Sequence, residues 1–218
     1  MDDLDPARTA AWMLENGMFK NGMTLRKTLG EERYQRFAAE AASLGMPAEG
    51  LQQFEPWVVG LQLVEMQYQK MGFDTQLGVE RQLEQRARAD GKEIRGLETV
   101  AEQLGLFDAL SYEEQARFLD MVVTEAEETE DQLDDVIAAW RSGNTRRLAK
   151  LLGEEFDDAA ALYKTIVSER NAKWMPALHK LLADDKDYLV VVGALHLVGD
   201  DGVLELARQQ GLKPVQLQ

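Results

Sequence analysis

The stretch "DYLVVVGALHLVGDDG", residues 187–202, decides the expected fold of this chain. Its first part is a continuous apolar, β-branched run (187–196) of the kind found in strands that are buried on both faces. The sequence that follows, "DDGVLELARQQG" (200–211), has a helical pattern, and "LKPVQLQ" (212–218) fits a short last strand. Together these segments predict a β-α-β unit with two parallel strands and a right-handed crossover.

Most of the remaining sequence has helical periodicity. We expect helices over about 5–90 and 99–182, including one from Pro56 to Met71, a long one that begins at a Ser111 capping box and reaches Trp140, and one over 156–182. Strands are expected near 92–97, 187–193 and 213–217. The sequence therefore predicts one domain over residues 1–218. Its fold class is α/β and predominantly helical, with a small mixed or parallel sheet and a large helical insertion.

Composition excludes several classes of function. The net charge of -15 disfavours nucleic acid as a partner, and the absence of cysteine rules out disulfides and thiolate chemistry. No apolar run approaches the roughly 20 residues that cross a bilayer, and the acidic start "MDDLDPARTA" does not resemble a signal peptide. As written, the chain is expected in the cytoplasm, without a membrane span. Phosphate-loop, dinucleotide, nucleophile-elbow and H-E-x-x-H motifs are all missing from the sequence.

His196 is the first candidate site residue, because the carboxyl ends of parallel strands converge on ligand sites. Gly193, placed at the end of the predicted strand, would leave room for a close approach. The spacing by itself favours a second interpretation, in which His196 bonds a backbone carbonyl or a nearby helix-capping aspartate and has only a structural role.

Two other places carry candidate residues. Glu98 follows the predicted strand 92–97 and would share an edge with His196, where a carboxylate and an imidazole could bind a divalent metal or form an acid–base pair. Its structural alternative is pairing with Arg95 or capping of the next helix. Arg170 and Asn171 could clamp a carboxylate or support an oxyanion, or Arg170 could anchor a buried ion pair.

The sequence also resembles a known family. The segments "ERNAKWMPALHKLL" (169–182) and "YLVVVGALHLVGDDGVLELARQQGLKPVQL" (188–217) resemble the C-terminal signature of the TraB/GumN family, which is related to the Tiki metalloproteases. The segments "GFDTQLGVERQL" (72–83) and "GKEIRGLETVAEQL" (91–104) resemble its middle part, so the resemblance extends from about residue 25 onward.

The resemblance implies a metal-dependent hydrolase or peptidase. It makes His196 a catalytic residue and metal ligand, Glu98 a ligand or general base, and Arg170 a substrate clamp, with Gly193 and Asn171 in support. The family's first G-x-x-H motif has no counterpart here, so the chain resembles an N-terminally truncated member. With His179 as the remaining histidine, the divalent metal site would be incomplete, and the chain alone could be inactive.

The resemblance also implies a cellular location and a class of substrate. A full-length parent would belong to the cell envelope or periplasm and act on a peptide or small-molecule substrate. Missing strands would leave unpaired edges, so we expect a homo-oligomer. Two alternatives remain: a non-catalytic binding or regulatory module that retains the fold, and a helical scaffold with an incidental β-α-β tail.

Overall fold

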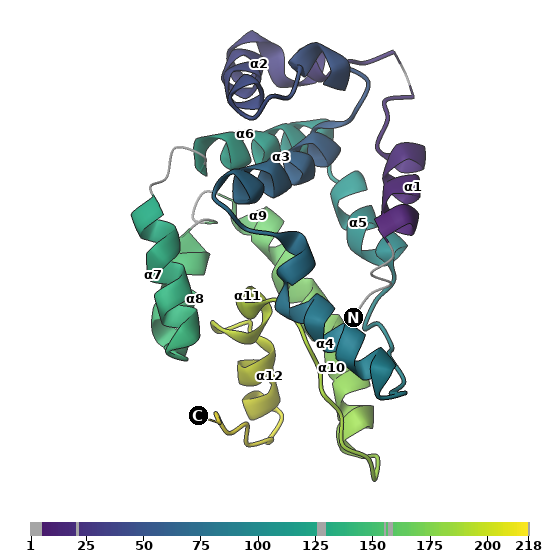
Figure 1. The fold of residues 1–218 in the computed structure, drawn as a ribbon, viewed down its shortest axis with the longest axis vertical. Helices are drawn as coiled ribbons and strands as arrows, with labels where there is room; N and C mark the ends of the chain where they lie inside the picture. The colour runs from purple at the N-terminus through teal and green to yellow at the C-terminus, as the bar shows by residue number, and fades with distance from the viewer. Residues whose placement is uncertain (1–5, 21, 126–129, 155, 157–158, 218) are drawn as a thin grey trace. The chain divides into compact units, whose positions relative to one another are not determined.

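The structure is a computed structural model that describes residues 6–20, 22–125, 130–154, 156 and 159–217. The chain divides into two compact units, unit 1 (Met1–Glu127) and unit 2 (Glu128–Gln218) (Figure 1). Both units are built from helices. In the described parts of the chain, no helix combines the length and apolar character that a membrane crossing needs.

Unit 1 is a set of helices arranged around α3 and α6. Its elements are α1 (Pro6–Asn16), α2 (Leu25–Ser43), η1 (Ala48–Leu51), α3 (Pro56–Lys70), η2 (Thr75–Leu77), α4 (Val79–Ala89), α5 (Val100–Asp108) and α6 (Tyr112–Glu125). Helix α6 packs against both α3 and α2, and α1 packs against α5 (Figure 1). The buried side chains of unit 1 include Phe37, Trp57, Leu63, Phe118 and Leu119.

The close packing of α3 on α6 depends on Gly60. A Cβ atom at this position would lie 2.7 Å from the ring of Phe118, closer than the two atoms can approach. Glycine therefore lets the aromatic ring rest directly on the α3 backbone. Opposite charges also join α2 to α6, through the ion pairs Arg36–Asp120 at 2.6 Å and Arg33–Glu113 at 3.2 Å.

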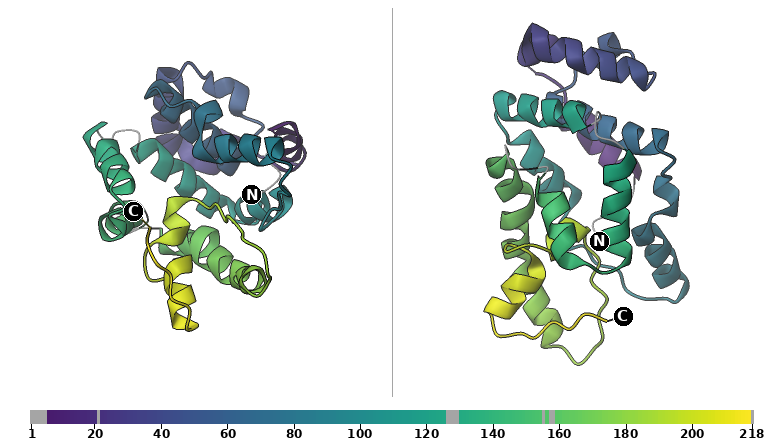
Figure 2. Two further views of the ribbon diagram at one scale, coloured as in Figure 1. Left: turned by 60° about the horizontal axis from the view of Figure 1, so that its bottom comes forward. Right: turned by 90° about the vertical axis from the view of Figure 1, so that its left-hand side faces the viewer.

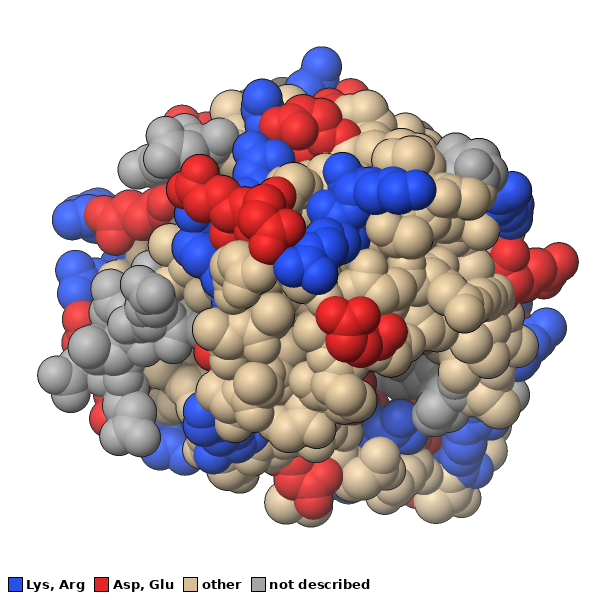
Figure 3. Space-filling model, turned by 90° about the horizontal axis from the view of Figure 1, so that it is seen from above, with Lys and Arg blue, Asp and Glu red and all other residues tan. Residues whose placement is uncertain are grey.

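Acidic and basic side chains are interspersed on the face shown in Figure 3. The excess of acidic residues is therefore not gathered into one acidic patch on this face. Exposed ion pairs between acidic and basic side chains contribute little to stability individually, typically about 0–1 kcal/mol.

Unit 2 has one long helical element with shorter helices packed against it. Its elements are α7 (Glu130–Arg141), α8 (Thr145–Glu154), α9 (Ala160–Tyr163), the π-helical segment η3 (Lys164–Ser168), α10 (Glu169–Leu182), α11 (Ala194–Leu197) and α12 (Val203–Gln209). Helix α12 lies against α10, and α11 contacts α8, α12 and η3 (Figures 1 and 2). One apolar cluster joins Val198 to Ala139 of α7 and Leu148 of α8.

The predicted α/β fold is wrong: the described residues contain no strand and no sheet. Residues 92–96, 187–193 and 212–217 run outside helices, but none pairs with another segment, and the β-type pairing found is a single bridge between Met18 and Phe54. The apolar run that was expected to be buried is largely open, with Leu189 75% and Val190 41% exposed. A β-branched sequence favours an extended backbone, but a strand exists only where a neighbour pairs with its N–H and C=O groups.

The structure has helices in the regions where the sequence predicts them, with some differences in their bounds. The helix expected from Pro56 is confirmed as α3, and the Ser111 capping box is confirmed by bonds in both directions with Glu114. The single helix expected up to Trp140 corresponds to α6 and α7, and residues 126–129 between them lie outside the described residues. The helix expected over 156–182 is split into α9, η3 and α10.

Candidate functional site

His196 lies in a short helix and not at the end of a strand. It is the third residue of α11, which begins after Gly193 and ends at Leu197. The next residue, Val198, is buried against α7 and α8 and fixes this turn in unit 2. The imidazole ring is thereby held against α10.

The two ring nitrogens of His196 both have partners from α10. Nδ1 lies 2.8 Å from Oδ1 of Asn171, and Nε2 lies 3.2 Å from Nη1 of Arg170. The Asn171 amide in turn donates to the backbone carbonyl of Asp201 at 2.8 Å. These contacts form one polar chain from Asp201 through Asn171 and His196 to Arg170.

The polar chain determines which tautomer His196 adopts. The Asp201 carbonyl can only accept, so the Asn171 nitrogen must point toward it and the Asn171 oxygen toward the ring. The ring therefore donates from Nδ1, while Nε2 accepts a hydrogen bond from the Arg170 guanidinium. Asn171 is fully buried, so this orientation is held firmly.

The same surroundings keep the imidazole neutral. Burial is the larger cause and the positive charge of Arg170 the second, and together they lower the pKa of His196 from an ordinary 6.5 to about 4. A neutral ring is consistent with the Nδ1–H tautomer that the hydrogen bonds require.

Trp174 packs against both His196 and Arg170. Its ring centroid lies 4.7 Å from that of His196, and the Arg170 guanidinium carbon lies 5.0 Å from the Trp174 ring centroid. Trp174 is only 4% exposed, so it packs tightly beneath both polar groups. A guanidinium over an indole face gains a favourable cation–π contact.

Local backbone structure brings these side chains together. The π-helical segment η3 immediately precedes α10, and its Ile166 carbonyl accepts a hydrogen bond from Arg170 Nη1 at 3.1 Å. On the other side, the 199–202 turn is tied to η3 by Ser168, whose hydroxyl donates to the Asp201 carboxylate at 2.7 Å. Short π-helical segments within helices often occur at functional sites.

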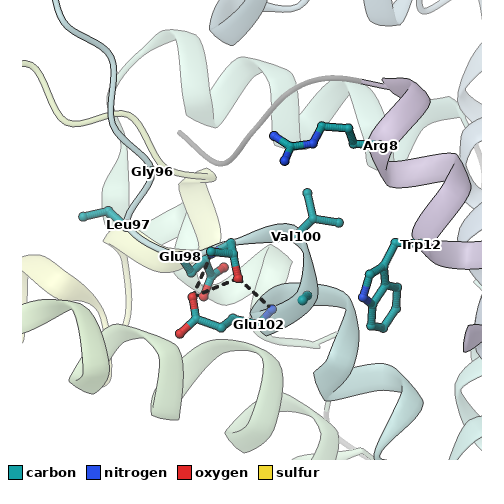
Figure 4. A pocket seen from close by; sticks show the side chains of 9 residues that line it. Arg8, Trp12, Gly96, Leu97, Glu98, Val100 and Glu102 are labelled. Atoms are coloured by element: carbon teal, nitrogen blue, oxygen red, sulfur yellow. Dashed lines mark hydrogen bonds between the residues drawn. The ribbon is translucent and has the colours of Figure 1, made fainter.

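Glu98 belongs to a pocket in unit 1. The pocket has a volume of about 540 Å³, and Figure 4 shows Arg8 and Trp12 of α1 on one side, with Glu98 and Val100 on the other. Glu98 is 6% exposed and directly precedes Thr99, the N-cap residue of α5. Thr99 and Glu102 form the capping box of α5, so the N-cap side chain of this helix is that of Thr99.

The structure brings together some of the predicted site residues. Arg170, Asn171 and His196 form one cluster, as described above. Glu98 lies in the other unit, and its pairing with His196 stays a prediction. His179 contacts Gln210 of unit 2 through its Nε2 atom.

Gly193 does not end a strand, because residues 187–193 form none. It precedes α11 as a cap residue with an ordinary φ of -56°. A Cβ atom there would meet only His196 Cδ2 at 3.8 Å, an ordinary contact distance. The glycine that close packing demands is Gly202, where a Cβ atom would lie 2.5 Å from the Val198 carbonyl oxygen.

The His196 cluster does not fit the divalent metal that the resemblance implies. A metal needs a free nitrogen lone pair, but Nδ1 carries a proton and the Nε2 lone pair faces a guanidinium cation. A divalent ion bound there would also be repelled by Arg170. Within the part of the chain that the structure describes, no three His, Cys, Asp or Glu residues gather in a way that could hold a metal.

Sequence reasoning missed two members of the cluster, Trp174 and the Asp201 backbone. A signal for Trp174 was present, because it follows Arg170 by four residues and so shares its helix face. The Asp201 carbonyl had no such signal, since its position depends on how the 199–202 turn packs on α10.

Comparison with known proteins places these observations in context. The sequence model of the TraB/PrgY/gumN family matches residues 1–216. Two curated relatives, each named "Uncharacterized protein YbaP", come from Escherichia coli (strain K12) and Shigella flexneri. Each is 24% identical over 184 residues, which cover 84% of this chain and 68% of the relative. No solved structure matches the chain.

Proposed function

The chain belongs to the TraB/PrgY/gumN family, and from this premise we propose that it is a hydrolase acting on a carboxylate-bearing peptide or small molecule. In this proposal Arg170 binds the carboxylate, His196 accepts a proton, and Asn171 positions the imidazole. The observation that carries it is the polar chain from Asp201 to Arg170 through the buried Asn171.

The chemistry of the cluster supports these roles. A guanidinium presents planar N–H groups that match a carboxylate, and that of Arg170 lies over the Trp174 ring. An imidazole held in the Nδ1–H tautomer has its basic Nε2 directed toward the same guanidinium. A proton acceptor and an anion-binding group are thus adjacent, an arrangement suited to general-base hydrolysis of a substrate that carries a carboxylate.

No step of the proposal passes through a metal ion, because the donor set around His196 does not suit one. The proposed base is the imidazole itself, oriented by an amide as in catalytic sites where a third residue fixes the histidine tautomer. Glu98 is proposed as a second functional carboxylate, to be tested separately.

An activity assay with matched variants tests the proposal. The purified chain would be screened against a broad set of fluorogenic peptides and esters that carry a free carboxylate. We expect His196→Gln to lower kcat at least about 100-fold, the lower end of what a general base contributes. Arg170→Gln should raise KM. His179→Gln, which changes the other histidine, should leave activity unchanged.

Two results would contradict the proposal. One is activity that His196→Gln leaves intact. The other is activity that is lost with a chelator and restored by added zinc or manganese, which would return the function to metal-dependent hydrolysis.

A second candidate function is a non-catalytic binding module. The observation that favours it is that both ring nitrogens of His196 are already engaged, so the ring has no open position until a partner moves. Calorimetric binding of a carboxylate-bearing peptide, with no turnover of any substrate in the screen, would select this alternative.

A further inference from the structure

We infer that the apolar run "YLVVV" (188–192) is an interface at which two copies of the chain pair as antiparallel strands, about a two-fold axis at Val190. This interface goes beyond the proposed function and is independent of it, since that function concerns His196 and its neighbours. Backbone, side chains and flanking charges of the run each contribute to the inference.

The backbone of this run is open to a partner strand. Residues 187–193 lie outside helices, and in the described part of the chain no backbone–backbone hydrogen bond involves residues 189–192. Unpaired N–H and C=O groups along an extended segment are a template for pairing with another chain. The run therefore fits an extended peptide segment, whose own backbone groups can complete the ladder of hydrogen bonds.

The side chains of the run favour pairing as well. Tyr188, Leu189 and Val190 are substantially exposed, and the run has no charged residue. Three consecutive valines, at 190–192, favour an extended backbone because β-branched side chains pack well on a pleated surface. Pairing removes part of the exposed apolar area from water, which is favourable.

Another segment of unit 2 that lies outside helices, residues 212–217, is a poor partner for the run. Pro214 has no N–H group, so it cannot complete a ladder of hydrogen bonds. Gln216 is held at the turn between α7 and α8, where its side chain donates to the Gly143 carbonyl at 2.8 Å. A second copy of the chain, in contrast, presents the run itself.

Charges next to the run decide the direction of pairing. The run directly follows Asp185, Lys186 and Asp187. In a parallel pair in register, each of these residues would face the same residue of the second copy, and like charges directly opposite each other are destabilising. In an antiparallel pair the two charged stretches lie at opposite ends of the ribbon. Charge complementarity between the two copies therefore selects the antiparallel direction.

The ends of the run decide the register. It is bounded by Asp187 and Gly193, and Val190 is its middle residue. When the two-fold axis passes through Val190, every residue of the run faces a residue of the run, and Asp187 faces Gly193. A shift of one residue would place the Asp187 carboxylate opposite the apolar Val192, or leave the apolar run one partner short.

This register pairs side chains of suitable kinds. Leu189 faces Val191 of the second copy, which is an apolar pair. Tyr188 faces Val192 of the second copy, and aromatic–β-branched pairs across strands are stabilising. Because a two-fold interface uses the same patch on both copies, each of these pairs occurs twice. Within the run, Val190 alone faces its own counterpart.

Cysteine cross-linking tests this arrangement, because the chain has no cysteine of its own. The variants are Tyr188→Cys, Val190→Cys and Val192→Cys, with Leu182→Cys as the control at an exposed leucine outside the run. Each would be oxidised with copper phenanthroline at micromolar concentration, and the covalent dimer would be measured on non-reducing gels. A disulfide needs Cα atoms within about 7 Å of each other, so it reports which residues face one another.

We expect Val190→Cys to form the covalent dimer at least about tenfold faster than Leu182→Cys, because paired cysteines react at a high effective concentration. Tyr188→Cys alone and Val192→Cys alone should react at the rate of the control, since neither residue faces its own counterpart. An equimolar mixture of Tyr188→Cys and Val192→Cys should cross-link rapidly.

A second measurement uses the unmodified chain and does not depend on any variant. Pairing protects backbone amides, so hydrogen exchange of residues 189–192 should be slow at high protein concentration and become faster on dilution. The amides of α3, which are bonded within one chain, should exchange at a rate that dilution does not change.

Three results would overturn the inference. The first is cross-linking of Val190→Cys no faster than that of Leu182→Cys. The second is rapid cross-linking of all three run variants by themselves, which indicates a parallel pair. The third is exchange of the 189–192 amides at a rate independent of concentration, which indicates that no second copy covers them.

Discussion

At the scale of single residues, Asn171 has the greatest influence on the site. It is fully buried and links the Asp201 carbonyl to the His196 ring, so both of its polar ends are in use. Buried polar groups of this kind stabilise a structure only while every member keeps its partner. The two residue-scale predictions concern this link and the charge of the ring.

Asn171 and His196 should be energetically coupled. Asn171→Leu leaves two polar groups without a partner, and we expect it to lower the free energy of unfolding by about 2 kcal/mol. In a double-mutant cycle, Asn171→Ala and His196→Ala should show a coupling energy of about 1 kcal/mol, measured by urea unfolding. Asn144→Ala, at a cap of α8, should be additive with His196→Ala. Additivity of the first pair would disprove the link.

His196 should make stability depend on pH in a definite direction. Its pKa is about 4 in the folded chain against an ordinary 6.5, so below pH 6.5 the unfolded chain binds a proton that the folded chain does not. The stabilisation is complete above pH 6.5 and is lost as the pH falls from 6.5 through 4.

The measurement for this second prediction compares His196→Gln with the unmodified chain at several values of pH. The difference in unfolding free energy between pH 7 and pH 4 should be smaller in the variant by about 2 kcal/mol, after allowance for partial solvent screening. His179→Gln is the matched control, and an equal pH dependence in the unmodified chain and His196→Gln would show that the ring is not held neutral.

At the scale of elements, the 199–202 turn determines where the site residues stand. Gly202 packs against the backbone of residues 197 and 198, and the neighbouring Asp201 bonds both Ser168 and Asn171. The turn thus connects α11, which carries His196, to η3 and α10. A substitution that shifts this turn should therefore also shift the His196 ring.

A pair of glycine variants tests this connection. Gly202→Ala places a Cβ atom 2.5 Å from one carbonyl oxygen and 2.7 Å from another, and should destabilise the chain by about 2 kcal/mol because rigid backbone atoms must shift. Gly193→Ala meets only ordinary contacts and should change stability by less than about 0.5 kcal/mol. Thermal unfolding measures both, and equal effects would contradict the role given to Gly202.

At the scale of the whole molecule, unit 2 carries exposed apolar side chains on segments that have no strand partner. Leu189, Val190, Val215 and Leu217 all lie on such segments and are substantially exposed. Extended apolar segments with unpaired backbone groups tend to associate with other chains. Self-association of the chain therefore stays a prediction.

Light scattering coupled to gel filtration measures self-association. At micromolar concentration we expect a mass above the 24.5 kDa of one chain. Leu189→Lys with Val190→Lys should shift the mass toward the monomer, because charged side chains protect exposed edges. Leu14→Lys, at an exposed leucine of unit 1, is the control. A monomer at this concentration would disprove the prediction.

Helices and their ends were predictable from the sequence because their signals are local. The capping box at Ser111 and the apolar spacing of α3 depend on residues within one or two turns of each other. The strand predictions failed for a complementary reason. The run at 187–193 has the composition of a strand, but pairing requires a second segment that the local pattern does not specify.

The candidate site, like the fold, was partly predictable from the sequence and partly decided by tertiary contacts. The sequence by itself determined which residues to consider, since Arg170 and Asn171 lie next to each other and His196 follows a glycine at a fixed spacing. Only the tertiary structure decided what they do to one another: the packing of α11 and the 199–202 turn on α10 engages both ring nitrogens and lowers the pKa of His196. Charge and tautomer depend on burial and on partners that are 25 and 26 residues distant in sequence, and no local pattern encodes those contacts.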